Sequence, residues 1–281
     1  MKPGTLSTRI NKAWPILLQP LLSLLAVLVG VGSFVLVASG KSPKRPAKTS
    51  PEEPPSILMV GDSLSVGKFG EVIQTHFEQK NYPVSVYASC GSSPEHWLRG
   101  EPDFYTKCGY RQHTGNSDVF SDFVNGRPPR RTRTPKIESL IEKLKPTVVI
   151  VQLGTNWMDR SLSEPQMESY LHRFLKAAKH APVRRVIWIT PPDSYRFRNV
   201  QGRFSQLIRD VAKNEQVLIV ESKTHYKMGK TGNDGIHYNA ESSQAWAQQI
   251  QKDLDSKIAP PVLSRRLSKF KPDDSAGGGT E

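Results

Sequence analysis

A serine, an aspartate and a histidine stand where the sequence predicts turns at the ends of strands. Ser63 lies in LMVGDSLSVG, residues 58–67, where an apolar run stops at Gly, Asp and Ser before helix-forming sequence. Asp234 and His237 lie three residues apart in NDGIHYN, residues 233–239. A hydroxyl, an imidazole and a carboxylate are together able to transfer an acyl group from an ester through a covalent intermediate.

Each of these residues also has an ordinary structural explanation. Ser63 stands where it could cap a helix, because a serine side chain there accepts hydrogen bonds from the first free N–H groups. A lone histidine such as His237 is more often a partly buried loop residue than a catalytic base. Four compatible segments at successive strand ends favour a nucleophile at Ser63, and at that turn the residue could serve as both.

An acyl-transfer site also needs donors aimed at the oxyanion of the tetrahedral intermediate. The backbone N–H groups of Ser63 and Gly91 and the side-chain amide of Asn156 are the candidates, since each follows a predicted strand. Gly91 could equally permit a turn, and Asn156 could cap the next helix. Trp157, beside Asn156, is either a residue that stacks on a sugar ring of the substrate or a core residue.

The elements that must position these groups form an alternating series. Five β-branched runs predict buried parallel strands, at residues 56–61, 83–88, 147–153, 184–190 and 216–222. Amphipathic stretches predict the helices, at residues 64–80, 135–145, 164–180, 200–214 and 240–258. This order predicts one three-layer α/β domain over residues 56–258, in which ligands bind outside the carboxyl ends of the strands.

Residues 89–134 interrupt the series and are too long for an ordinary connection, so they are a candidate insertion that shapes the site. They contain Cys90 and Cys108, which we expect to form a disulfide in an oxidising compartment, the alternative being two buried thiols. The sequence has no metal-ligand motif and no glycine-rich phosphate loop, so neither a metal nor a cofactor is expected.

Basic residues are concentrated in one run of the insertion. The chain has a net charge of +13, and RPPRRTRTPK, residues 127–136, contains no acidic residue. Arg130, Arg131 and Arg133 in this run are candidate contacts for an anionic polymer, the alternative being a solvated loop. A nucleic-acid partner is not expected, because the N-terminus indicates export.

The N-terminal region predicts export to or across a membrane. Residues 21–38 include no charged side chain, and this apolar segment is long enough to cross a bilayer with its flanks. We expect a short basic N-terminus at 1–13, a transmembrane signal anchor at 14–38 and a proline-rich charged linker at 39–55. The catalytic domain would then be periplasmic or extracellular, and secretion after signal cleavage is the alternative. Residues 259–281 are predicted to be a mobile tail.

Four motifs in this order resemble the blocks of the GDSL or SGNH hydrolases. The matching residues are Gly61-Asp62-Ser63-Leu64-Ser65, Gly91, Gly154-Thr155-Asn156 and Asp234 to His237. The resemblance covers roughly residues 56–258. It implies a flavodoxin-like sheet, with Ser63 as nucleophile, His237 as base, Asp234 as its partner, and Gly91 and Asn156 in the oxyanion hole. Trp157 stands where family members often have Asp, as it does in some carbohydrate-active members.

The residues and the resemblance together predict a membrane-tethered serine esterase that removes acetyl groups from a cell-envelope carbohydrate. An O-acetyltransferase of the same family would form the same acyl-enzyme and pass the acyl group to a sugar hydroxyl. A catalytically silent binding module with this fold is the third possibility, because a fold alone does not establish activity.

Overall fold

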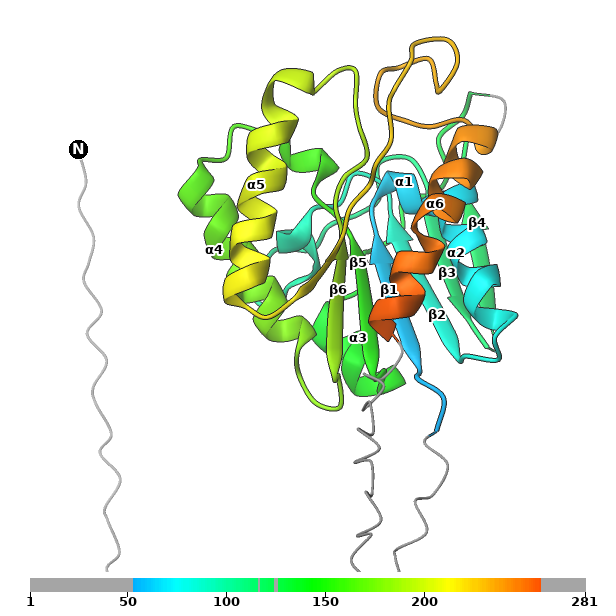
Figure 1. The fold of residues 1–281 in the computed structure, drawn as a ribbon, viewed down its shortest axis with the longest axis vertical. Helices are drawn as coiled ribbons and strands as arrows, with labels where there is room; N and C mark the ends of the chain where they lie inside the picture. Colours follow the sequence, from blue (N-terminus) through cyan, green and yellow to red (C-terminus); the bar gives the residue numbers. More distant parts are fainter. Residues whose placement is uncertain (1–52, 116, 124–125, 259–281) are drawn as a thin grey trace, which may run out of the picture. The chain divides into compact units, whose positions relative to one another are not determined.

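The computed structural model describes residues 53–115, 117–123 and 126–258, which contain a seven-stranded sheet in the order β4-β3-β2-β1-β5-β6-β7 (Figure 1). The strands are β1 (Ile57–Gly61), β2 (Val84–Ser89), β3 (Tyr110–Thr114), β4 (Ser117–Ser121), β5 (Val148–Gln152), β6 (Arg185–Ile189) and β7 (Leu218–Val220).

The five predicted strands are β1, β2, β5, β6 and β7, and they pair in parallel. Their order is that of a flavodoxin-like sheet, in which the chain moves outward from β1 first to one side and then to the other. Ligands of such sheets bind at this reversal point. Ser63 stands two residues after the end of β1 and therefore lies there.

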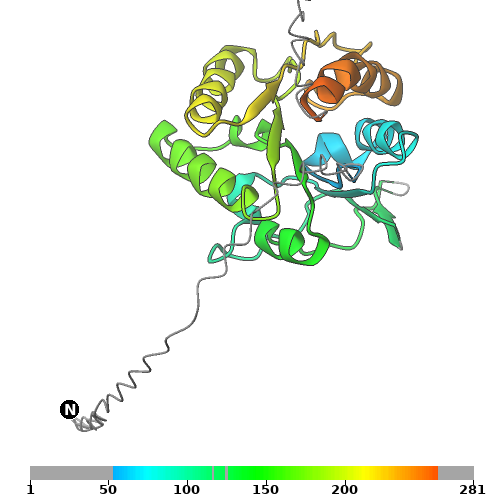
Figure 2. The same ribbon diagram turned by 60° about the horizontal axis from the view of Figure 1, so that its bottom comes forward.

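Helices cover both faces of the sheet, with α2 and α6 on one face and α3, α4 and α5 on the other (Figures 1 and 2). The helices are α1 (Ser63–Val66), α2 (Lys68–Glu78), α3 (Ile137–Leu144), α4 (Glu164–Ala178), α5 (Arg198–Asn214) and α6 (Ala240–Ile258), with 3₁₀ turns η1 (Pro94–Trp97) and η2 (Thr155–Trp157). The expected three-layer α/β architecture is therefore confirmed.

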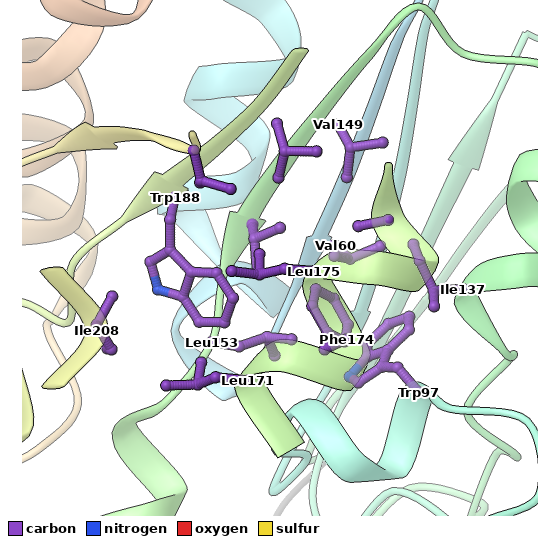
Figure 3. Close-up of a cluster of buried hydrophobic side chains, with 14 of the residues drawn as sticks. Val60, Trp97, Ile137, Val149, Leu153, Leu171, Phe174, Leu175, Trp188 and Ile208 are labelled. Atoms are coloured by element: carbon purple, nitrogen blue, oxygen red, sulfur yellow. The ribbon is translucent and has the colours of Figure 1, made fainter. Parts of the chain in front are cut away.

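Each face of the sheet has its own apolar core. Alternate residues of a strand point to opposite faces, so Val60 packs under α3 to α5 while Met59 packs under α2 and α6. In the first core, Trp188 and Phe174 meet edge to face, with their ring centroids 5.8 Å apart (Figure 3). Burial of both faces explains why the strands read as continuous apolar runs.

The helix predicted over residues 64–80 is in fact two helices. The backbone breaks at Gly67, between the short α1 and the longer α2. Close packing follows this break, because a Cβ atom on Gly70 would lie only 2.0 Å from the carbonyl oxygen of Ser65. The break leaves α1 as a separate short helix that begins at Ser63.

The prediction of about five strands is wrong in number, because the insertion adds two more. β3 and β4 form an antiparallel hairpin, and β3 pairs with β2, so the sheet extends at that end. All but the last residue of β4 are exposed, and the sequences YRQHT and SDVFS lack the continuous apolar character of the parallel strands. A hairpin at the edge of a sheet buries few side chains, so its sequence contains no continuous apolar run.

No helix in the described ranges is both long and apolar enough to cross a membrane. The predicted anchor at residues 14–38 lies outside those ranges. So do the basic N-terminus, the C-terminal tail and all but the last residues of the predicted linker.

Candidate active site

The turn between β1 and α1 holds Ser63 at the first position of the helix. Asp62 is the helix cap, since its Oδ1 accepts a hydrogen bond from the Leu64 N–H at 3.0 Å. The capping role considered for Ser63 therefore belongs to its neighbour. This leaves the Ser63 hydroxyl available for chemistry.

Asp62 lies in a buried polar cluster beneath the nucleophile. Ser65 Oγ donates to Gln152 Oε1 at 2.7 Å, and both side chains are buried with Asp62. Burial raises the pKa of Asp62 to about 6, although the hydrogen bond from Leu64 and the neighbouring His237 act in the opposite direction. The structure therefore places the buried carboxyl group of Asp62 at the site, and the sequence motif predicts no role for it.

Ser63, His237 and Asp234 form a continuous relay. His237 Nε2 lies 2.9 Å from Ser63 Oγ, and His237 Nδ1 lies 2.6 Å from Asp234 Oδ2. A carboxylate can only accept, so the ring carries its proton on Nδ1 and leaves Nε2 to accept from the serine hydroxyl. Residues 174 positions apart are thus brought into the arrangement that base catalysis by histidine requires.

Asp234 is held as a carboxylate by several donors. Its partial burial would raise the pKa of the carboxyl, but hydrogen bonds from the His237 ring and from the backbone N–H groups of His237 and Ile236 lower it overall. The two backbone N–H groups donate to Oδ1 at 2.8 and 2.9 Å, while Oδ2 serves the ring. Oδ1 therefore accepts hydrogen bonds from the backbone, and Oδ2 accepts the hydrogen bond from the ring.

A tyrosine and a serine outside the predicted site hold the turn that contains Asp234 and His237. The hydroxyl of the buried Tyr226 accepts from the Gly235 N–H and donates to the His237 carbonyl, both at 3.1 Å. Ser194 Oγ donates to the Gly235 carbonyl at 2.7 Å. No spacing rule connects these residues to the histidine, so only the folded chain reveals them.

The two other predicted oxyanion donors lie on loops that are joined to each other. Gly91 has φ of +81°, a backbone conformation that favours glycine, and it follows Cys90, which lines the same cavity as Ser63. Asn156 Nδ2 donates to the Ser92 carbonyl at 2.9 Å, linking the segment after β5 to the segment after β2. One of the two amide hydrogens of Asn156 is used in this bond. Neither Gly91 nor Asn156 is among the residues that line the cavity at Ser63, and their roles as oxyanion donors stay predictions.

A disulfide joins Cys90 to Cys108, the pair expected to bond, with 5.4 Å between their Cα atoms. Cys90 is buried, and its N–H also donates to the Gly109 carbonyl at 3.0 Å. The disulfide and this hydrogen bond therefore connect the start of the insertion, next to Gly91, to the residues that precede β3.

Trp157 is not a surface residue, so the idea that it stacks on a sugar ring of the substrate is wrong. Its side chain is 1% exposed, meets Phe204 edge to face, and donates through Nε1 to Glu95 Oε2 at 2.7 Å. Burial raises the pKa of Glu95, while the bonds from Trp157 and Arg160 act against that rise. The tryptophan supports η2 from within the core.

The cavity at Ser63 has a volume of about 350 Å³ and lies between the nucleophile, the hairpin and the start of α6. The residues lining it are Ser63, Leu64, Val66, Gly67, Lys68, Cys90, Cys108, Gly109, Asp122, His237, Tyr238, Ala240 and Ser243. The described residues include no group of three or more His, Cys, Asp or Glu side chains placed to hold a metal ion.

The three arginines considered as substrate contacts are not among the residues that line this cavity. Arg133 pairs with Asp103 at 2.7 Å, and Arg131 lies over the Tyr105 ring at 6.0 Å. The expectation that Arg130, Arg131 and Arg133 contact an anionic substrate therefore stays a prediction. The side chains of Arg131 and Arg133 make local contacts within the insertion.

Solved structures share the fold of this chain. A solved acetyl esterase with bound acetate has a TM-score of 0.50 at 15% identity, over 72% of this chain and 98% of that one. A carbohydrate esterase family 3 structure from Talaromyces cellulolyticus has a TM-score of 0.50 at 16% identity, over 72% of this chain and 98% of that one. The chain has the SGNH hydrolase fold. The fold that the motif resemblance implies is therefore confirmed.

A relative is found among the curated proteins as well. Protein BcsX of Komagataeibacter xylinus is 26% identical over 227 residues, which is 74% of this chain and 81% of that protein. No established family profile matches the chain.

Proposed function

We propose that the protein is a serine esterase that removes acetyl groups from a carbohydrate through an acyl-enzyme on Ser63. The observation that carries this proposal is the relay from Ser63 through His237 to Asp234 at the reversal point of the sheet. The solved acetyl esterase and carbohydrate esterase with this fold support an acetylated carbohydrate as the substrate class.

The relay accounts for both halves of the reaction. Ser63 Oγ attacks the ester carbonyl while its proton passes to His237 Nε2, and that proton then goes to the departing alcohol. A water molecule next gives its proton to His237 and attacks the acyl carbon, which releases the acid and restores Ser63. Asp234 stabilises the ring when it is charged. The N–H groups of Ser63 and Gly91 and the amide of Asn156 are the proposed donors to the oxyanion.

Exposure of the base favours hydrolysis over transfer to another sugar. The side chains of His237 and Asp234 are 46% and 53% exposed, so water has direct access to the base. An acyltransferase needs to keep water away from the acyl-enzyme until its acceptor arrives. We therefore propose water as the acceptor, with the O-acetyltransferase as the alternative.

The cellular location in this proposal is based on sequence alone. An uncharged segment at residues 21–38 precedes the domain, and we propose that it anchors the protein with the domain outside the cytoplasm. An envelope polysaccharide would then be within reach.

The direct test is acetate release by the purified full-length protein from 4-nitrophenyl acetate and from an acetylated oligosaccharide. Each substrate is tested with and without an unacetylated sugar acceptor, and Ser63→Ala is the matched inactive control. Hydrolysis that is independent of the acceptor supports the proposal. Acetylated acceptor as the main product would instead establish the transferase, and equal rates for wild type and Ser63→Ala would contradict both.

A further inference from the structure

Near the cavity at Ser63, the β3–β4 hairpin of the insertion has an exposed aromatic ring. Phe120, on β4, is 54% exposed, a large fraction for a phenylalanine. β4 is the outer strand at the end of the sheet next to α2 (Figure 1). Its C-terminal end pairs with Tyr110, which in turn pairs with Ser89 at the carboxyl end of β2. Phe120 is therefore near the same edge of the sheet as Ser63.

A buried arginine connects this ring to the cavity wall. Arg111 lies opposite Phe120 in the hairpin, and its guanidinium carbon is 5.3 Å from the ring centroid. Arg111 Nε also donates to the carbonyl of Val66 at 2.8 Å, and Val66 lines the cavity. One face of the ring is thus covered and held by the guanidinium, and the exposed part of the ring is available to a ligand.

Two charged residues near the ring line the cavity that contains the nucleophile. Asp122, two residues after Phe120, lines the cavity, and so does Lys68 at the start of α2. Lys68 is 35% exposed and pairs with Glu71 at 2.9 Å. A held aromatic ring with a carboxylate and an ammonium group beside it combines an apolar surface for a sugar ring with acceptors and donors for hydroxyl groups.

We propose that Phe120, Asp122 and Lys68 form a saccharide subsite, which holds the sugar that carries or adjoins the ester cleaved at Ser63. The subsite rests on the proposed function, and it specifies the substrate as a sugar ester rather than a long-chain lipid ester.

The strand itself provides the control for the test. Val119 is 44% exposed and precedes Phe120, and successive side chains of a strand point to opposite faces. Val119→Ala therefore removes exposed apolar surface from the same edge strand without touching the proposed subsite. Phe120→Leu removes the ring and keeps an apolar side chain, while Phe120→Trp keeps an aromatic surface.

Two measurements on the full-length protein test the subsite. With an acetylated xylo-oligosaccharide as substrate, Phe120→Leu should raise KM about fivefold with kcat nearly unchanged, as expected for loss of aromatic stacking. The same variant should hydrolyse 4-nitrophenyl acetate at the wild-type rate. Val119→Ala should change neither, and Phe120→Trp should restore the KM.

Binding separates this proposal from the proposed function. In a Ser63→Ala background, which cannot turn over the ester, Phe120→Leu should raise the Kd for the same oligosaccharide about fivefold. If the wild type has no esterase activity and this binding still depends on Phe120, the esterase fails and the subsite stands. If 4-nitrophenyl acetate is hydrolysed but the oligosaccharide binds equally well to both variants, or not at all, the subsite is overturned and the esterase stands.

Discussion

The nucleophile and its base are held by two different kinds of structure. Ser63 follows a buried strand, and Asp62 and Ser65 on either side of it are 0% exposed. Asp234 and His237 lie in a long segment between β7 and α6 and are about half exposed. The first region is positioned by burial, whereas the second is positioned by hydrogen bonds to its backbone.

Because of this difference, substitutions in the two regions should have different effects on turnover and on the free energy of unfolding. Side chains beneath Ser63 belong to the core, so changes there should alter the free energy of unfolding more than turnover. The turn with the base contributes little apolar burial, so changes there should reduce turnover and leave the global stability nearly intact. The predictions below test that separation.

The largest effect is expected for His237→Ala. Loss of the base should lower kcat for 4-nitrophenyl acetate by about 10⁴-fold or more, because the serine hydroxyl then has no proton acceptor. The urea midpoint should remain within error of the wild type. His225→Ala is the matched control in the same segment, since the His225 side chain is 70% exposed and should be dispensable. Comparable activity in the two variants would exclude His237 as the base.

Asn156→Ala should have the next largest effect. Loss of a donor that acts on the oxyanion should lower kcat by about 10²- to 10³-fold with a smaller change in KM. Asn214→Ala, at the end of α5, is the control. A change confined to KM would instead make Asn156 a contact for the bound substrate.

Tyr226→Phe should loosen the turn that holds the base. The variant loses the hydroxyl that binds Gly235 and His237, so we expect a reduction in kcat of about tenfold and faster exchange of the Gly235 amide hydrogen. Tyr170→Phe, on α4, provides the comparison on the other face of the sheet. Unchanged kcat and exchange would show that the hydroxyl does not hold this turn.

The smallest effect on turnover, and the clearest effect on stability, is expected for Asp62→Asn. Burial raises the pKa of Asp62 from 3.8 to about 6, so the folded state binds this proton more tightly than the unfolded state does. The resulting stabilisation is complete below pH 3.8 and is lost as the pH rises through about 6. Replacement by Asn removes this dependence. Urea midpoints at pH 4 and pH 7 should therefore differ less in the variant, and an equal difference in both proteins would contradict the prediction.

Sequence patterns were sufficient where burial or backbone geometry constrains residue type. The parallel strands, the helices between them and the motif residues Ser63, Asp234 and His237 each leave such a pattern. The hairpin β3–β4 was missed because an exposed edge carries no continuous apolar run. The sequence left Trp157 open between a substrate contact and a core residue, because one residue does not reveal which side of a turn it faces. Tyr226 and Ser194 act through contacts between segments that are far apart in the sequence, and no local pattern records those contacts.

The most direct test of the central claim is the site of covalent labelling by a fluorophosphonate. Tryptic cleavage after Lys48 and Lys68 gives one peptide, residues 49–68, that contains both Ser63 and Ser65, so fragmentation spectra are needed to assign the label. A single adduct on Ser63, absent from Ser63→Ala and from His237→Ala, is the predicted result. Labelling that persists in Ser63→Ala, or that maps to Ser65, would contradict the assignment of Ser63 as the nucleophile.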